Sequence, residues 1–261
     1  MGEFKERYGP VALVTGASSG IGVGFAEELA SRGLDLVLAA RRLDRMDLLK
    51  SRLEAAHGIA VRVVESDLSQ AQAPVELAAE VADIDVGLVI SNAGFGAKGW
   101  FETIDPDFMA DLLMVNCHAP MQLAHAFIPR LKARGKGGLV LTASVEGLMG
   151  GPFSAAYAAS KALVIALGEG LWGELAGTGV DVLTLCPGAT ESEAAAKQGF
   201  DPAKMQNVMK ARDVARLTLD NIANGPTFIS SAHYKAVFDQ LLSLPRSQAI
   251  MAMAAGMKPK G

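Results

Sequence analysis

Two residues of the sequence have the types and the spacing needed to transfer a proton. Tyr157 and Lys161 lie four residues apart in the run AAYAASKALV, which predicts a helix with both side chains on one face. A free phenol has a pKa of about 10 and is a poor base at neutral pH. An ammonium group about 4 Å away, at an effective dielectric constant near 20, favours the phenolate by on the order of 4 kcal/mol, or about three pKa units, before desolvation subtracts some of this. The pair therefore predicts a tyrosine that can give and take a proton.

Short apolar runs that alternate with helical patterns must position this pair. The runs are rich in Val and Leu at nearly every position, which is typical of strands buried on both faces of a parallel sheet. They lie at 11–15, 34–40, 60–66, 86–91, 138–144 and 180–186. Crossover helices are expected at 20–32, 42–56, 105–133 and 155–176. This order predicts an α/β fold, a doubly wound parallel sheet of about seven strands with helices on both faces.

No linker or change of composition divides the chain. Its 261 residues contain no Pro/Gly/Ser-rich spacer and no internal repeat, so a single domain over residues 1–261 is expected. The alternation of strand and helix ends near residue 186. Within the domain we expect a substrate-binding or lid region at 189–225 and a helical tail at 233–261, where apolar residues recur at roughly helical spacing.

Charge and composition argue against several kinds of partner. The net charge is −4 and the basic residues are scattered apart from RRLDR at 41–45, so no surface for nucleic acid is expected. Cys117 and Cys186 lie in apolar runs without a metal-binding partner at ligand spacing, which predicts no metal site and a reducing, cytoplasmic location. No signal-peptide pattern and no apolar run of membrane-spanning length is present, so no membrane partner is expected.

A glycine-rich turn follows the first expected strand. The run VTGASSGIGVG leads from that strand through Gly16, Gly20 and Gly22 into a helix. Glycine lets the backbone approach a ligand closely, and the helix N-terminus offers unpaired N–H groups and a favourable dipole to a pyrophosphate. The turn predicts a dinucleotide site, although a plain tight turn would use the same glycines.

Together these features resemble the short-chain dehydrogenase/reductase family. Its T-G-x-x-x-G-x-G signature is matched at positions 15–22, and SNAG at 91–94 is close to its N-N-A-G, with Ser91 in place of the first Asn. The remaining marks follow in the family's order, as Asn116, Ser144, Tyr157 with Lys161, and Pro187-Gly188. The resemblance covers about residues 11–190 and implies a single-domain Rossmann fold.

The resemblance also implies a role for each residue of the catalytic set. In the family the Tyr is the acid and base, the Lys also holds the nicotinamide ribose, the Ser orients the substrate oxygen, and the Asn supports a water that relays protons. The matching positions are Tyr157, Lys161, Ser144 and Asn116. Taken singly, each has an ordinary alternative, namely a packed ring beside a solvated amine, a turn cap, or a buried amide with a backbone partner.

The implied cofactor is NADP(H), with NAD(H) possible. An acidic residue at the end of the second strand would bind the ribose hydroxyls of NAD, but Ala40 stands there, followed by Arg41 and Arg42. A guanidinium suits a 2′-phosphate in charge and geometry. The alternative is that Arg42 and Arg45 lie on the solvent face of the next helix.

Further cofactor contacts are implied by the resemblance along the rest of the chain. Asp67 matches the family's adenine-contacting Asp but could equally cap the helix that follows. The Pro-Gly turn backs the nicotinamide ring in the family, and a hydroxyl soon after it contacts the carboxamide. The full set expected to bind the cofactor is Gly16, Ser18, Ser19, Gly20, Ile21, Gly22, Arg41, Arg42, Asp67, Leu68, Asn92, Ala93, Gly94, Tyr157, Lys161, Pro187, Gly188, Thr190 and Ser192.

The expected activity is hydride transfer between the nicotinamide and a carbonyl or secondary alcohol. A lipophilic or bulky ketone or aldehyde is favoured because the expected pocket is apolar and rich in Met. Its residues are Phe95, Val145, Leu148, Met149, Phe153, Phe200, Met205 and Met209. The alternative is that the Met residues form the core of a helical lid. A non-catalytic NADP-binding regulatory or scaffold protein is the alternative. The family resemblance implies a homodimer or homotetramer.

Overall fold

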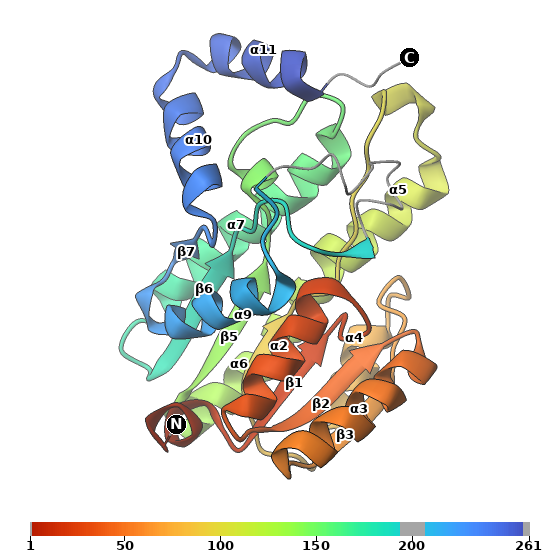
Figure 1. Cartoon of the computed structure of the whole chain (residues 1–261), viewed down its shortest axis with the longest axis vertical. Coiled ribbons are helices and arrows are strands. Elements are labelled where there is room, and N and C mark those ends of the chain that lie inside the picture. Colours follow the sequence, from red (N-terminus) through yellow and green to blue (C-terminus); the bar gives the residue numbers. More distant parts are fainter. Residues whose placement is uncertain (1, 194–206, 258–261) are drawn as a thin grey trace.

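A parallel sheet of seven strands forms the centre of the molecule (Figure 1). The structure is a computed structural model, and it describes residues 2–193 and 207–257. The strands lie side by side in the order β3-β2-β1-β4-β5-β6-β7. Their bounds are β1 Val11–Thr15, β2 Asp35–Ala40, β3 Val61–Glu65, β4 Val86–Ser91, β5 Gly137–Thr142, β6 Val180–Leu185 and β7 Thr227–Phe228.

The predicted fold class is confirmed, and the bounds of the first six strands fall within two residues of those of the apolar runs. Every residue of β4 and β5 is buried, as expected for strands covered on both faces. The two-residue strand β7 had no apolar run to reveal it, and it pairs with the end of β6. The order of the strands reverses between β1 and β4, and sheets of this kind bind ligands at the carboxyl ends of the strands beside such a reversal.

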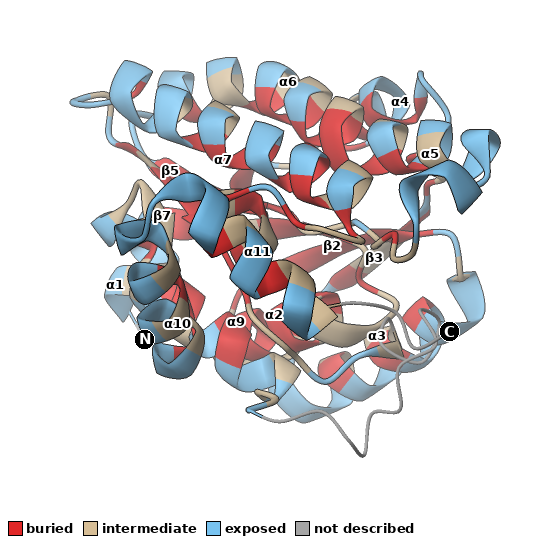
Figure 2. Cartoon of the chain, turned by 90° about the horizontal axis from the view of Figure 1, so that it is seen from above, coloured by how far each residue is buried: buried red, intermediate tan, exposed pale blue. Residues whose placement is uncertain are grey.

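Two layers of helices cover the sheet. One layer contains α2 (Gly20–Ser31), α3 (Leu43–His57) and α9 (Ala211–Asp220), and the other contains α4 (Ala73–Glu80), α5 (Pro106–Leu113), α6 (Ala119–Arg134) and α7 (Ala155–Glu174). Figure 2 shows the buried residues on the inward sides of both layers and in the strands between them. Each layer packs against the sheet in a hydrophobic core of its own. Phe25 of α2 lies in the core between the sheet and the first layer, whereas Phe127 of α6 and Val164 of α7 lie in the core between the sheet and the second layer.

The short helices complete the architecture around the sheet. Helix α1 (Gly2–Tyr8) precedes β1, and the 3-10 turns are η1 (Phe101–Thr103), η3 (Val145–Leu148) and η5 (Ile222–Asn224). Helices α10 (Ala232–Ser243) and α11 (Arg246–Met257) lie at the end of the molecule opposite the N-terminus (Figure 1). Phe238 and Met253 of these two helices pack into the core beside η3, so they cover the carboxyl edge of the sheet. None of the described helices is both long and apolar enough to cross a membrane.

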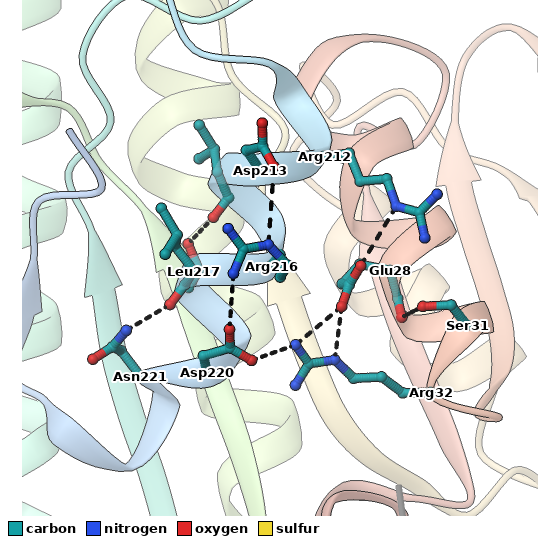
Figure 3. A network of polar contacts seen from close by, with 11 residues as sticks. Glu28, Ser31, Arg32, Arg212, Asp213, Arg216, Leu217, Asp220 and Asn221 are labelled. Atoms are coloured by element: carbon teal, nitrogen blue, oxygen red, sulfur yellow. Dashed lines mark hydrogen bonds and ion pairs between the residues drawn. The ribbon is translucent and has the colours of Figure 1, made fainter.

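Helices α2 and α9 pack closely and share a polar network, which we call the α2–α9 network (Figure 3). A Cβ at Gly24 would lie 2.5 Å from the carbonyl oxygen of Ala211, so only glycine allows this approach. The network consists of Glu28, Arg32, Arg212, Arg216 and Asp220. Arg32 donates to Glu28 (3.0 Å) and to Asp220 (2.6 Å), which joins the two helices.

The helix expected over 105–133 is interrupted by a π-helical turn. Between α5 and α6 the turn η2 (Met114–His118) is π-helical, and the N–H of Ala119 donates to the carbonyl of Met114 five residues earlier. Pro120 has no N–H to donate to the carbonyl of Asn116, so the α-helical pattern cannot continue through this point. Such turns are frequent at functional sites, and this one carries Asn116.

Candidate active site

Ser144 and Tyr157 meet at the carboxyl ends of the central strands. Ser144 follows β5 and caps η3, and its Oγ accepts a hydrogen bond from the Glu146 N–H (3.2 Å). Tyr157 lies in the first turn of α7, and its side chain is hydrogen-bonded to that of Ser144. The short 3-10 turn and the loop after it lead the chain from the strand into α7. The structure therefore brings these two predicted residues into direct contact.

Lys161 lies one turn further along α7 and is almost completely buried, with 3% of its surface exposed. Its Nζ donates to the carbonyl of Thr142 at the end of β5 (2.9 Å) and lies 5.8 Å from the centre of the Tyr157 ring. A Cβ at Gly147 would lie 2.7 Å from the Lys161 carbonyl carbon, so η3 packs directly on α7 at this point. The expected placement of Tyr157 and Lys161 on one helix face is found in the structure.

Asn116 is held beside this pair by the π-helical turn. Its Oδ1 accepts from the Phe95 N–H (3.0 Å), and its Nδ2 donates to the Phe95 carbonyl (2.9 Å) and to Ser160 Oγ (3.0 Å). A Cβ at Gly94 would lie 3.0 Å from both Asn116 Oδ1 and Lys161 Nζ. Asn116 thus has the backbone partner that its structural alternative requires, and it also lies close to the lysine that the catalytic interpretation requires.

The electrostatics of the tyrosine differ from the prediction. Burial raises the pKa of Tyr157, the carboxylate of Glu146 raises it further, and the hydrogen bond from Ser144 acts in the opposite direction. Burial lowers the pKa of Lys161 from 10.5 to about 8. The prediction that Lys161 brings the phenol pKa down toward neutrality is therefore wrong, because burial and the Glu146 carboxylate raise that pKa. The Tyr157 phenol keeps its proton at neutral pH, as a proton donor must.

The glycine-rich turn has the geometry that a bound pyrophosphate needs. Gly16 and Gly20 have φ angles of +66° and +55°, which favour glycine. A Cβ at Gly22 would lie 2.2 Å from the Gly16 carbonyl oxygen, so the turn closes on itself only without side chains. Ser19 precedes α2 and makes no side-chain hydrogen bond to its first turn, which leaves the helix N–H groups of that turn to a ligand. These residues fit a dinucleotide.

The SNAG turn joins the glycine-rich turn to the catalytic residues. Thr15 Oγ1 accepts hydrogen bonds from the N–H groups of Asn92 (3.0 Å) and Ala93 (3.1 Å), and Asn92 Nδ2 donates to the Thr15 carbonyl (3.2 Å). A Cβ at Gly16 would lie 2.9 Å from the Ala93 Cα. The carboxyl ends of β1 and β4 are thereby locked together at the reversal of the strand order.

An arginine site lies next to the glycine-rich turn. Arg42 donates to Ser18 Oγ (3.1 Å) and to Glu193 Oε2 (2.9 Å), and Arg45 donates to the other oxygen of Glu193. These contacts place Arg42 against the turn rather than on the solvent face of α3. The two guanidinium groups lower the pKa of Glu193 to about 2. A site that binds a carboxylate in this way fits the 2′-phosphate of NADP(H), and Arg45 is a member that the sequence interpretation missed.

Asp67 makes local contacts, but they are not those of the helix cap that was its structural alternative. Its Oδ1 accepts from the N–H (3.2 Å) and the Oγ (3.0 Å) of Ser69, and it lies 3.9 Å from Nη1 of Arg41. Helix α4 begins only at Ala73, so Asp67 closes a turn and does not cap that helix. The neighbouring Leu68 is buried against Val115. The contact of Asp67 with adenine and the contact of Leu68 with the cofactor remain predictions.

The segment after β6 returns to the glycine-rich turn. Thr190 Oγ1 donates to the Gly188 carbonyl (3.1 Å), and a Cβ at Gly20 would lie 3.0 Å from the Cβ of Ser192. The ring of Tyr234, from α10, fills the space beside Gly188, where a Cβ would lie 2.1 Å from it. The Ala189 N–H donates to the Tyr234 oxygen. Tyr234 was missed because only the fold brings α10 to the Pro-Gly turn.

The apolar residues expected to line a substrate pocket divide into two groups. Val145 and Met149 are buried in the core with Phe238 and Met253, so their prediction as lining residues is wrong. Phe95 packs edge-on to Phe108, and Leu148 and Met209 are partly buried against the two cores. The predicted residues Phe200 and Met205 fall outside the described part of the chain.

Phe153, which was expected in the pocket, forms an aromatic pair with Trp100, a residue that the sequence interpretation missed. The rings of Trp100 and Phe153 pack edge to face with their centres 4.9 Å apart, and the Gly99 N–H donates to the Phe153 carbonyl (2.9 Å). Trp100 and the next residue, Phe101, are largely exposed. They lie in the loop between β4 and α5, for which the sequence has no periodic pattern.

An ion pair at this edge was also missed. Lys98 Nζ lies 2.6 and 2.7 Å from the two carboxylate oxygens of Glu146, two residues after Ser144. The two residues are 48 positions apart in separate loops, so no spacing in the sequence could pair them. Among residues 2–193 and 207–257, no group of three or more His, Cys, Asp or Glu side chains could hold a metal ion.

Comparisons with known proteins agree with this geometry. A model of the short chain dehydrogenase family matches residues 10–202. The 7β-hydroxysteroid dehydrogenase of Clostridium sardiniense is 32% identical over 228 residues, which are 87% of this chain and 87% of that protein. The structure of a short-chain dehydrogenase from Sphingobium yanoikuyae in complex with NADPH is 33% identical, with a TM-score of 0.82 over 93% of this chain and 95% of that one. A bulky-bulky ketone specific alcohol dehydrogenase from Comamonas testosteroni is 31% identical, with a TM-score of 0.78 over 97% and 96%.

Proposed function

This chain belongs to the short-chain dehydrogenase family, and from that premise we propose that it reduces a bulky, lipophilic ketone or aldehyde with Tyr157 as the proton donor. It is an NAD(P)-dependent oxidoreductase that acts on CH–OH and C=O groups, and NADP(H) is its preferred cofactor. The observation that carries the proposal is the meeting of Ser144, Tyr157 and Lys161 at the carboxyl edge of the sheet.

Each catalytic side chain has a task that follows from its contacts. When bound, the nicotinamide supplies the hydride for reduction or accepts it for oxidation. Ser144 and Tyr157, which are hydrogen-bonded to each other, hold the substrate oxygen between their hydroxyl groups. Tyr157 keeps its proton at neutral pH and gives it to this oxygen as the carbonyl is reduced. Lys161 Nζ uses one hydrogen bond for the Thr142 carbonyl and holds the cofactor ribose and the proton path with its remaining N–H groups.

The cofactor is held by two groups of residues. The first turn of α2 and the glycines before it hold the pyrophosphate, since their N–H groups and dipole favour an anion. Arg42 and Arg45 hold the 2′-phosphate, because their guanidinium groups already bind one carboxylate, and Ser18 Oγ accepts from Arg42 beside them. Asn116 supports the water that relays protons to Lys161.

The apolar surface beside Tyr157 favours a bulky substrate. Trp100 and Phe101 expose large rings in the same loop as Lys98, and Lys98 Nζ lies 6.0 Å from the centre of the Tyr157 ring. The Ile250 side chain of α11 packs beside Gly150, so α11 closes this side of the site. Two of the similar proteins are a hydroxysteroid dehydrogenase and an alcohol dehydrogenase specific for bulky ketones, which supports the same substrate class.

The outer face of the α5–α7 layer favours a homo-oligomer. Leu113, Met121 and Leu163 are exposed on this layer, although each is a large apolar side chain (Figure 2 shows the exposed side of these helices). Burial of this face in a second copy would join two chains through the helices that flank Asn116 and carry Tyr157. Leu163→Glu is expected to shift the oligomer toward monomer in sedimentation velocity experiments.

A substrate screen with a matched variant tests the proposed function. The loss of NADPH absorbance is followed with steroid ketones, diaryl ketones, bulky aldehydes and small 2-keto acids, in parallel with NADH. The expected result is turnover of bulky apolar carbonyls with NADPH, and a loss of at least about 100-fold in Tyr157→Phe, which keeps the ring but has no proton to donate. Turnover confined to small charged acids, or an equally active Tyr157→Phe, would contradict the proposal.

A further inference from the structure

Lys98 and Glu146 form a second charged unit beside Tyr157. Lys98 belongs to the loop after β4 and Glu146 to η3, and their side chains are only 17% and 22% exposed. Lys98 Nζ contacts both oxygens of the carboxylate, at 2.6 and 2.7 Å. Ser154 Oγ donates a third hydrogen bond to Glu146 Oε2 (2.6 Å). A charged pair at this depth needs such complete pairing, because an unpaired partner would be costly.

The ion pair lies at a joint between two loops. On one side are Lys98 and its neighbours, and on the other is the segment that leads from η3 into α7. The same two loops are joined by the hydrogen bond from Gly99 to Phe153 and by the packing of Trp100 on Phe153. These contacts therefore hold the two loops together on the side of Tyr157 where Trp100 and Phe153 lie.

Two ammonium groups flank the Tyr157 ring at similar distances. Lys98 Nζ lies 6.0 Å and Lys161 Nζ 5.8 Å from its centre. Lys98 is paired with a carboxylate, whereas the one hydrogen bond of Lys161 Nζ within the described chain goes to the backbone carbonyl of Thr142. With the Glu146 carboxylate present, Lys98, Lys161 and Glu146 together place one net positive charge near the phenol. Without it, Lys98 and Lys161 place two positive charges there.

We propose that Lys98 and Glu146 are positioning residues for the reduction, whose ion pair locks the two loops and fixes one carboxylate charge beside the Tyr157 phenol. The inference rests on the proposed function, because the pair acts through Tyr157 as the proton donor. Neither the sequence pattern nor the set of Asn116, Ser144, Tyr157 and Lys161 gives Lys98 or Glu146 a task in the reaction. The inference gives them one.

The charges around the phenol give the direction of the effect. Glu146 and Cys186 raise the pKa of Tyr157, in addition to its burial, and Ser144 lowers it through a hydrogen bond. Glu146 also raises the pKa of Tyr234 on α10, so its charge reaches both tyrosines at this edge. Loss of Glu146 leaves Lys98 and Lys161 without a nearby carboxylate and favours the phenolate. Loss of Lys98 leaves the carboxylate uncompensated and favours the phenol.

The test is the pH profile of kcat/KM for NADPH-dependent reduction by the full chain. Removal of the Glu146 charge favours loss of the proton from both Tyr157 and Lys161, and the Lys161 pKa of about 8 places the start of the loss of activity at alkaline pH. In Glu146→Gln the loss of activity at alkaline pH is therefore expected to begin about one pH unit lower than in the unaltered protein. In Lys98→Met the loss of activity at alkaline pH is expected to begin at a higher pH than in the unaltered protein. In the double variant it is expected to begin within a few tenths of a pH unit of the unaltered protein. Glu146→Asp, which keeps the charge, is expected to keep the original profile and covers the case in which Glu146→Gln fails to fold.

A pair of the same chemistry on α10 provides the control. Lys235 and Asp239 form an exposed ion pair (2.6 Å) outside the site, and Asp239→Asn is expected to leave the profile unchanged. Superimposable profiles for Glu146→Gln, Lys98→Met and the unaltered protein would overturn the inference while Tyr157→Phe stays inactive. An active Tyr157→Phe would instead overturn the proposed function, so the two failures are distinguishable.

Discussion

Glu28 in the α2–α9 network and Lys161 at the carboxyl edge of the sheet are both buried charged residues, but in the described part of the chain only Glu28 is paired with opposite charges. In the network, Glu28 has a side chain only 10% exposed, and it is paired with both Arg32 and Arg212 (Figure 3). At the carboxyl edge, Lys161 is buried more deeply, and its ammonium is paired only with the Thr142 carbonyl among the described residues. A buried, unpaired ammonium costs stability. We therefore expect the network to hold the two helices together, whereas Lys161, which we propose for the proton path, lowers the stability of the fold.

Replacement of Lys161 should give the largest effect and separate these two roles. Lys161→Met keeps the length and the apolar stem of the side chain but removes the charge. We expect kcat/KM with NADPH to fall at least about 100-fold, because the ribose contact and the proton path are lost. The free energy of unfolding in urea at pH 7 should stay the same or rise, because the cost of burying the ammonium disappears. A variant that is both inactive and much less stable would contradict the comparison.

The stability of the unaltered protein should depend on pH through the same lysine. Its pKa is lowered from 10.5 to about 8, so between these values the unfolded lysine holds a proton that the folded one has released. The free energy of unfolding contributed by Lys161 therefore rises with pH across this window, by on the order of 3 kcal/mol at about 1.4 kcal/mol per pKa unit.

Urea unfolding at several pH values checks this dependence. Lys161→Met is expected to exceed the unaltered protein in stability most clearly below pH 8, and the difference should shrink toward pH 10.5. The raised pKa values of Tyr157, Cys117 and Cys186 act in the opposite direction but are present in both proteins. A difference that is constant with pH would show that the lysine does not titrate in this window.

A change in the α2–α9 network should lower stability and leave activity nearly unchanged, which is the reverse of the result expected for Lys161→Met. Glu28→Ala leaves Arg32 and Arg212 without their shared carboxylate and should lower the free energy of unfolding by about 2 kcal/mol. Turnover with NADPH should stay within about twofold, because the network lies outside the catalytic set. Glu80→Ala, which breaks an exposed contact of 3.7 Å with Arg62, is the control and should change stability little.

The smallest effect is expected for Glu193, which is paired with arginines as in the network but lies at the proposed cofactor site. This carboxylate is paired with Arg42 and Arg45 as in the network, but the same arginines are proposed to hold the 2′-phosphate. Glu193→Gln should tighten NADPH binding by a few fold in fluorescence titrations, because the competing charge is removed, and should leave NADH binding unchanged. Arg42→Ala is expected to weaken NADPH binding instead. Equal changes for the two cofactors in Glu193→Gln would argue against this competition.

Much of the fold could be predicted from the sequence because its signals are local. Six strands lie in runs rich in Val and Leu, and Tyr157 and Lys161 share a helix face whatever surrounds that helix. The π-helical turn at Asn116 and the two-residue strand β7 could not be predicted in this way, because neither has a periodic pattern. Val145 and Met149 illustrate a different limit, since an apolar side chain suits a pocket and a core equally well.

The sequence by itself determined the sheet, the glycine-rich turn and the spacing of the proton-transfer pair, since each depends on residues near one another in the chain. Only the tertiary structure decided the electrostatics of the site. Burial of Tyr157 and Lys161 shifts both pKa values away from the expected ones, and the Lys98–Glu146 pair joins two loops far apart in sequence. Desolvation and through-space charge depend on what surrounds a group in three dimensions, and that surrounding exists only after the chain has folded.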